Sequence, residues 1–135
     1  MEKKQYKLCL EILRRFDKAK ILEHLVLIGS WAVFFYKDYF ASDASFNHAT
    51  IKTRDMDFLI CSPHRIKERV DIQSLLEDLG FLPSFSGGKG YMKLTHPDLI
   101  IEFLVPDKGK GLDKPYPVPR LGINAQTLRF LDLLS

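Results

Sequence analysis

The sequence is poor in cysteine and in long apolar runs, and neither sign of charge dominates. Its two cysteines, Cys9 and Cys61, are too few for a disulfide framework, so we expect two reduced structural thiols. No apolar stretch approaches the roughly 20 residues of a membrane-spanning helix. Lys3 and Lys4 are followed by mixed charge rather than by the apolar segment of a secretory signal. These absences predict a cytoplasmic protein that does not enter a membrane.

The charge and the composition are those of an ordinary globular domain. The chain has 20 lysines and arginines against 17 aspartates and glutamates, and its net charge of +3 is too small to indicate nucleic-acid binding by bulk electrostatics. Hydrophobic residues make up 46% of the chain, which is enough for a normal core. A chain of 135 residues has room for one compact domain, so we expect one domain over residues 1–135; the sequence contains no internal repeat.

The spacing of apolar residues predicts alternating helices and strands. Three- and four-residue spacing indicates amphipathic helices over residues 5–23, after Gly29-Ser30, over 64–79 with Gly80 as its cap, and from 124 to 134. Short apolar or alternating runs indicate strands over residues 25–28, 55–60, 81–85, 91–95 and 99–105. We expect the first strand to be buried on both faces, the third to be an edge strand because it contains Pro83, and the third and fourth to form a hairpin. The pattern predicts an α/β (α+β) fold, with loops over 40–53 and 106–119.

The stretch Asp55-Met56-Asp57-Phe58-Leu59-Ile60 carries the clearest chemical signal. Acidic and apolar residues alternate, as in a strand, so Asp55 and Asp57 share one face at a Cα separation of about 6.5–7 Å. Two neighbouring carboxylates repel each other unless a cation lies between them. Mg²⁺ binds in proteins through one or two carboxylates together with substrate phosphates. We therefore predict a metal site at Asp55 and Asp57.

A further carboxylate, Glu102, interrupts the apolar run over residues 99–105. A lone glutamate in such a strand is costly to bury unless it is paired or bound to a cation. One interpretation is a salt bridge to a lysine or arginine. The other, which we favour because a neighbouring strand already carries two acids, is a third metal ligand beside Asp55 and Asp57.

The Gly29-Ser30 pair lies where the first strand turns into a helix. Free backbone N–H groups and the positive end of a helix dipole meet at such a turn, and together they bind phosphate. An ordinary helix cap explains the same two residues. His48 has no second histidine or cysteine at ligand spacing, which argues against a metal site there. The roles of the basic residues in loops and turns stay open between phosphate contacts and solvated side chains: Arg54, Lys89, Lys108 and Lys110.

These pieces, taken in order, resemble the nucleotidyltransferase superfamily typified by DNA polymerase beta, which includes the toxins of abortive-infection and toxin–antitoxin systems. The family pattern is an apolar residue with Gly-Ser, then acid-apolar-acid-apolar, then an acid between apolar residues. The matching segments are Ile28-Gly29-Ser30, Asp55-Met56-Asp57-Phe58 and Ile101-Glu102-Phe103. The interval from Gly29 to Asp55 is longer than in many members, which indicates an insertion over residues 40–53.

The resemblance implies a small mixed sheet with helices mainly on one face, and two Mg²⁺ ions, or Mn²⁺, held by carboxylates. Asp55, Asp57 and Glu102 would be the catalytic and metal-binding residues, and Gly29 and Ser30 would bind the nucleotide. The reaction implied is transfer of a nucleoside monophosphate from a nucleoside triphosphate to an acceptor hydroxyl, with release of pyrophosphate.

Three interpretations stay open from the sequence: an active nucleotidyltransferase, a nucleotidyltransferase-fold module that binds nucleotide or protein without catalysis, and an unrelated α/β interaction module. The acceptor could be RNA, protein or a small molecule. Many active members of the superfamily carry a second domain. The apolar stripe over residues 124–134 runs to Ser135 without a terminating glycine or proline, so we expect the native chain to continue into a C-terminal helical region. That region, or another subunit, would cover part of the aromatic run between Trp31 and Phe40.

Overall fold

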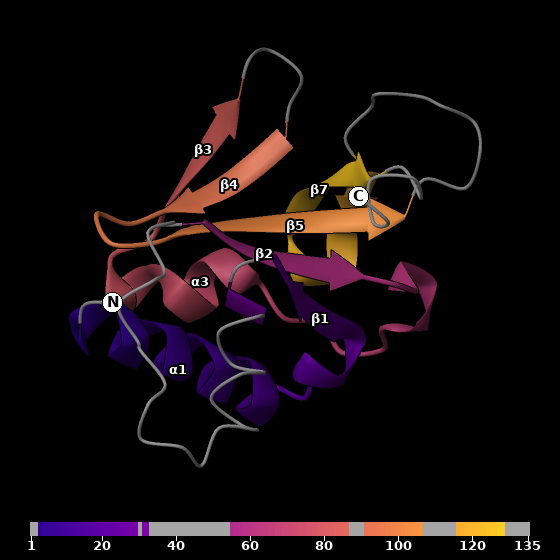
Figure 1. Cartoon of the computed structure of the whole chain (residues 1–135). Helices are drawn as coiled ribbons and strands as arrows, with labels where there is room; N and C mark the ends of the chain where they lie inside the picture. Colours follow the sequence, from indigo (N-terminus) through magenta and orange to yellow (C-terminus); the bar gives the residue numbers. More distant parts are fainter. Residues whose placement is uncertain (1–2, 30, 33–54, 87–90, 107–115, 129–135) are drawn as a thin grey trace.

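The computed structural model describes residues 3–29, 31–32, 55–86, 91–106 and 116–128 (Figure 1). The helical segments and strands run in the following order: α1 Lys3–Lys18, the 3₁₀ turn η1 Leu22–His24, β1 Leu25–Ile28, β2 Asp55–Ile60, η3 Pro63–Arg65, α3 Ile72–Leu76, η4 Glu77–Leu79, β3 Leu82–Ser86, β4 Tyr91–Thr95, β5 Ile100–Pro106, β6 Tyr116–Val118, η5 Pro119–Leu121 and β7 Ile123–Leu128.

The described strands form one seven-stranded mixed sheet in the order β1-β2-β5-β4-β3, with β7 paired to β5 and β6 paired to β7. β5 is the central strand, because it lies parallel to β2 and β7 and antiparallel to β4. The first half of β5 pairs with β4 through residues 100–102, and the second half pairs with β7 through residues 104–106. β5 therefore links the two halves of the sheet.

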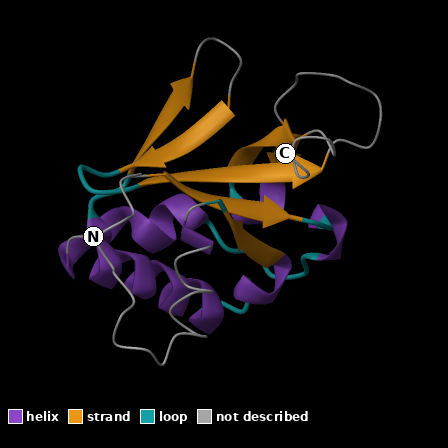
Figure 2. Cartoon of the chain, in the orientation of Figure 1, coloured by secondary structure: helices purple, strands orange, loops and turns teal. Residues whose placement is uncertain are grey.

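Helices α1 and α3 both lie on the same side of the sheet, which is the lower side in Figures 1 and 2. The core forms between them and the sheet, because α1 buries Cys9, Ile12 and Phe16 completely against the strands. The Phe16 ring packs edge-on against Phe58 of β2 at a centroid distance of 5.3 Å, and Phe58 stacks on Phe103 of β5 at 5.9 Å. The predicted mixed sheet with helices mainly on one face is therefore confirmed.

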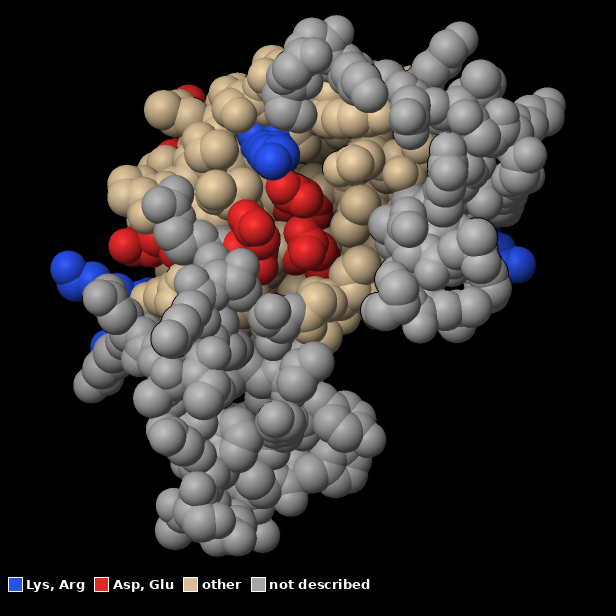
Figure 3. All heavy atoms as spheres, turned by 45° about the horizontal axis from the view of Figure 1, so that its top comes forward, with Lys and Arg blue, Asp and Glu red and all other residues tan. Residues whose placement is uncertain are grey.

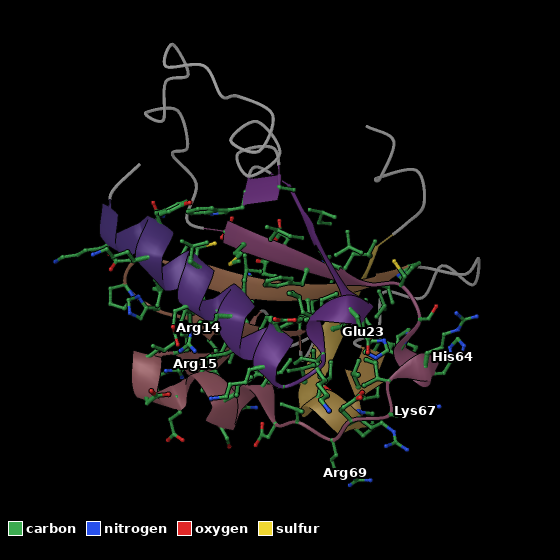
Figure 4. The ribbon with its side chains drawn as sticks, turned by 90° about the horizontal axis from the view of Figure 1, so that it is seen from below. Arg14, Arg15, Glu23, His64, Lys67 and Arg69 are labelled. Carbon is green, nitrogen blue, oxygen red and sulfur yellow. The ribbon has the colours of Figure 1, made fainter. Side chains whose placement is uncertain are left out.

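An arginine joins the two helices at the lower side of the molecule. Arg15 of α1 donates through Nη1 to the carbonyl oxygen of Leu75 at 2.8 Å and through Nη2 to Asp78 Oδ2 at 2.9 Å, and Figure 4 shows it beside the α3 segment. Asp78 lies in η4, directly after α3. This contact joins α1 to the α3–η4 segment on one side of the sheet.

The helix predicted over residues 64–79 is wrong for most of its length. The segment begins with the 3₁₀ turn η3 and continues without regular structure to Asp71, and only Ile72–Leu76 is α-helical. The Val70 N–H donates to the carbonyl of Arg120 at 2.8 Å, so this backbone bonds to a distant segment instead of to its own preceding turn. The Gly80 cap is confirmed, with a left-handed φ of 99°.

The helix predicted over residues 124–134 is wrong over residues 124–128, because Ile123–Leu128 is strand β7. Ile123 and Ala125 are buried while Asn124 and Gln126 are more exposed, which is the two-residue period of a strand. The apolar spacing of Ala125 and Leu128 had suggested a helical stripe, but pairing with the second half of β5 decided the conformation. Residues 129–135 lie outside the described part of the chain.

Three smaller predictions need correction. The first helix ends at Lys18 rather than at residue 23. β1 is not buried on both faces, because Val26 is 47% exposed. In the described sheet it is also an edge strand, which pairs with β2 alone. The loop predicted over residues 106–119 contains the short strand β6 at Tyr116–Val118. The β3–β4 hairpin and the edge position of β3 are confirmed.

The remaining sequence predictions concern the two thiols and a membrane-spanning helix. Cys9 is buried, Cys61 is exposed, and both are free thiols. Burial raises the pKa of the Cys9 thiol to about 12. Within the described residues, no helix has both the length and the apolar character needed to cross a bilayer.

Candidate active site

The candidate site lies on the face of the sheet opposite the helices. On β2, Met56, Phe58 and Ile60 are fully buried toward α1, so the alternate residues Asp55 and Asp57 point to the other face. The same alternation on β5 buries Ile101 and Phe103 and turns Glu102 to the face of the aspartates. Figure 3 shows a group of acidic side chains gathered on this face, with a basic side chain beside it.

Strand pairing brings two of the predicted carboxylates into direct register. Asp57 of β2 pairs with Glu102 of β5 in the parallel ladder, and Glu102 pairs with Lys93 of β4 in the antiparallel ladder. The three side chains therefore form a row across adjacent strands, as direct cross-strand neighbours. Asp55 lies two residues before Asp57 on the same face. The predicted acids Asp55, Asp57 and Glu102 are thus brought together.

Lys93 was not predicted as a site residue, and it contacts Glu102. Its Nζ lies 2.9 Å from Glu102 Oε1, and the two side chains are 36% and 22% exposed. The salt bridge that was the alternative interpretation of Glu102 is therefore present, although it lies within the acidic group rather than apart from it. The hydrogen bond from Lys93 to Glu102 is the main cause that raises the pKa of the Lys93 ammonium. The alternation around Lys93 indicates which face it occupies, but the register that places it opposite Glu102 is a tertiary feature.

Asp57 has the most perturbed environment in the group. Burial raises the pKa of its carboxyl from 3.8 to about 7, with further contributions from the negative charge of Glu102, a hydrogen bond with Glu102 and the charge of Asp55. The positive charge of Lys93 opposes this increase. Among the described residues, Asp57 Oδ1 is buried and has no hydrogen-bond partner. A buried carboxylate in this state is stabilised by any cation that reaches it.

The backbone of Gly29 lies directly against Asp57. Gly29 follows β1 and has a left-handed φ of 78°, and a Cβ atom at this position would lie 3.2 Å from Asp57 Oδ2. Residues other than glycine rarely adopt this backbone conformation. Gly29 therefore lies beside the acidic group in a conformation that favours glycine, and its predicted contact with nucleotide stays a prediction.

Several predicted residues lie outside the described part of the chain. Ser30, the second half of the predicted phosphate-binding turn, is among them. So are His48 and the basic residues whose roles were left open: Arg54, Lys89, Lys108 and Lys110. The placement of these side chains remains a prediction.

The donor set fits a hard divalent cation such as Mg²⁺ in its chemistry. It consists of carboxylate oxygens, and one of them, Asp57 Oδ1, is buried without a partner among the described residues. As the side chains stand in the described segments, no three His, Cys, Asp or Glu side chains enclose a space for a metal ion. One oxygen of Glu102 is instead held by Lys93. The donor atoms therefore suit the ion in their chemistry, and the Lys93 ammonium occupies the oxygen of Glu102 that would bind it.

Comparison with known proteins gives one result. Residues 7–135 match the family described as Nucleotidyltransferase. No curated protein and no solved structure matched the chain. Because the family match extends over nearly the whole sequence and the three carboxylates of the superfamily pattern gather on one face of a mixed sheet, the chain belongs to this nucleotidyltransferase family.

Proposed function

We propose that the protein is a Mg²⁺-dependent enzyme that transfers a nucleoside monophosphate from a nucleoside triphosphate to an acceptor hydroxyl. The observation that carries this proposal is the pairing of Asp57 with Glu102 on adjacent strands, beside Asp55 and against the backbone of Gly29. Transfer of this kind depends on positioning and on neutralising charge rather than on a covalent intermediate with the protein. A group of three acids next to a glycine turn provides both requirements.

The three carboxylates would bind metal ions at two positions. Asp55 and Asp57 would hold metal ions that also contact the triphosphate, and Glu102 would hold the ion nearest the acceptor. Bound there, Mg²⁺ would supply charge neutralisation at the attacking and leaving oxygens and would favour loss of the acceptor's proton. The raised pKa of Asp57 supports a cation at this carboxylate, because a carboxylate destabilised by burial and by Glu102 gains from a positive charge.

The residues next to β1 would hold the triphosphate. The lack of a side chain at Gly29 lets a phosphate group approach the backbone beside Asp57. Ser30 would donate its hydroxyl to a β- or γ-phosphate oxygen. The acceptor oxygen forms its bond to the α-phosphorus as the bond to the β-phosphate breaks, and pyrophosphate leaves. Glu102, on the acceptor side, would receive the hydroxyl proton and release it to solvent.

A second function is favoured by one observation, the ion pair between Lys93 and Glu102. If the ammonium stays on Glu102 when nucleotide binds, the acceptor cannot be activated at this position. The protein would then be a nucleotide-binding module of the same family without catalysis. The two functions share the nucleotide site and differ in whether Glu102 is released.

Incubation with labelled nucleotides tests the proposal. Each of the four nucleoside triphosphates, labelled at the α-phosphate, would be mixed with the protein, Mg²⁺ and RNA, protein or small-molecule fractions of a cell extract. We expect label in one fraction and equimolar pyrophosphate, both lost in EDTA. Asp57→Asn should lower the rate by roughly 100-fold or more, since loss of one charge-stabilising group typically has this effect.

The matched control is Asp17→Asn, which removes the same charge from an exposed position of α1. It should transfer label at the wild-type rate. Nucleotide binding without transfer in every fraction would favour the non-catalytic module. Absence of both binding and transfer in the wild-type protein would refute the proposed function.

A further inference from the structure

The fold holds a positive charge inside the acidic group at Lys93. Met92 and Leu94, the neighbours of Lys93 on β4, are 4% and 0% exposed in the core, so strand alternation commits the Lys93 side chain to the site face. Its cross-strand partner in the ladder is Glu102 itself. Lys93 is therefore positioned by the sheet and not by a chance contact between surface side chains.

The ammonium acts on all three acids of the site. It lies 2.9 Å from Glu102 Oε1, and its positive charge interacts favourably with both Asp55 and Asp57. In the absence of metal it supplies part of the neutralisation that three gathered carboxylates require. A divalent cation at Glu102 would meet this ammonium at close range, and two positive charges about 4 Å apart repel each other even in water.

The ammonium can leave Glu102 at little cost if another anion takes its place. The pair is partly exposed to solvent, and partly exposed ion pairs contribute little to stability. The triphosphate of a bound nucleotide carries several negative charges and, under the proposed function, would lie over Asp55 and Asp57 on the same face. It is the natural acceptor for an ammonium that moves only as far as its flexible side chain allows.

We propose that Lys93 occupies Glu102 until a nucleoside triphosphate binds, and that it then moves to the phosphates and releases Glu102 to a second metal ion. This inference rests on the proposed function and adds an order of events to it: the first metal ion binds at Asp55 and Asp57 without nucleotide, and the second binds only with it. Lys93 is thus both a phosphate-binding residue and the device that couples nucleotide binding to metal binding at Glu102.

Counting bound Mn²⁺ tests this order without any measurement of activity. The full chain would be titrated with Mn²⁺ by electron paramagnetic resonance, with and without a nucleotide analogue that carries a methylene group between its α- and β-phosphates. The wild-type protein should bind one ion alone and two with the analogue. In Lys93→Met a second ion should bind without the analogue. Its affinity should be at least about fivefold higher than any second-ion affinity that the wild type shows without the analogue. The analogue should bind about fivefold more weakly to this variant.

Two controls separate charge from local structure. Lys93→Arg keeps a cation opposite Glu102 and should retain the wild-type count of one ion without analogue and two with it. Lys67→Met removes the same charge from an exposed position on the helix side of the molecule and should also behave as the wild type (Figure 4). Circular dichroism would establish that each variant is folded.

The outcomes distinguish this inference from the proposed function. A wild-type protein that binds neither Mn²⁺ nor the analogue refutes both. Two ions in the wild type without analogue, or an unchanged count and affinity in folded Lys93→Met, overturn the Lys93 inference alone. If Lys93→Met does not fold, the variant Glu102→Gln tests the inference instead. Without its partner, Lys93 is free to contact the phosphates, so in EDTA this variant should bind the analogue more tightly than the wild-type protein does. Equal affinities would overturn the inference.

Discussion

The raised pKa of Asp57 predicts that the metal-free protein loses stability as the pH rises from about 4 to about 7. The folded protein keeps the Asp57 proton over this range, whereas the unfolded chain, with a pKa of 3.8, has released it. The folded state therefore binds more protons than the unfolded state, and the free energy of unfolding falls until the pH passes the folded pKa. Above that pH the loss is complete and the curve is level.

The magnitude follows from the two pKa values. An increase from 3.8 to about 7 corresponds to at most about 4 kcal/mol, and solvent at this partly exposed site reduces it, so we expect about 2–3 kcal/mol. Urea unfolding in EDTA at half-unit steps from pH 4.5 to 8 measures it. The pH range lies above the region in which the lowered pKa values of Glu11 and Asp78 matter, because those contributions are lost at lower pH.

The variant Asp57→Asn isolates the contribution of this one carboxyl. It lacks the titrating group, so the difference between its free energy of unfolding and that of the wild type should grow in its favour from pH 4.5 to 7.5. Titrating groups that do not interact with Asp57 cancel in this difference, whereas Glu102, Asp55 and Lys93 interact with it directly. Added Mg²⁺ should flatten the wild-type curve, because the ion favours the ionised carboxylate. Parallel curves for the two proteins in EDTA would refute the reasoning.

Three further predictions concern the backbone, the core and the cysteines. Gly29→Ala should lower the free energy of unfolding by about 1–3 kcal/mol in urea, because its left-handed backbone is strained by a side chain and the new Cβ would crowd Asp57; it should also weaken binding of a fluorescent nucleotide. Phe58→Ala should lower the free energy of unfolding by about 3–5 kcal/mol in the same assay, since it leaves a cavity between α1 and the sheet. Ellman's reagent should modify Cys61 quickly in the native protein and Cys9 only after unfolding, because Cys9 is fully buried and burial raises its thiol pKa to about 12.

Each of these predictions has an outcome that contradicts it. Wild-type stability and nucleotide affinity in Gly29→Ala would mean that the turn relaxes without affecting the site. A loss below about 1 kcal/mol for Phe58→Ala would contradict its place in the core. Two fast-reacting thiols in the native protein would contradict the burial of Cys9.

Local sequence was sufficient for the parts of the site that depend on strand alternation. Asp55 and Asp57 share a face because successive residues of any extended strand point to opposite sides. Glu102 could be recognised as unusual because six apolar neighbours surround it in the sequence. Gly29 was identifiable at the end of an apolar run, where a turn requires a residue that tolerates a positive φ.

Local patterns failed where neighbouring segments compete for the same backbone. Residues 123–128 have apolar spacing that suits either a helix or a strand, and pairing with the free half of β5 made them a strand. Residues 64–71 do not form the predicted helix, because the Val70 N–H donates to the carbonyl of Arg120. Arg120 lies 50 residues later in the chain, so the spacing of nearby residues could not indicate this hydrogen bond. Both errors involve hydrogen bonds between residues far apart in the sequence.

The sequence by itself determined which acidic residues the strands carry and which face of its own strand each one occupies, because these follow from residue type and from a two-residue period. Only the tertiary structure decided that Asp57, Glu102 and Lys93 form one row. That row depends on the register between three strands, and register is set by how the whole sheet buries its apolar face against α1 and α3. The presence of the Lys93 ammonium beside the three carboxylates is therefore a consequence of the fold.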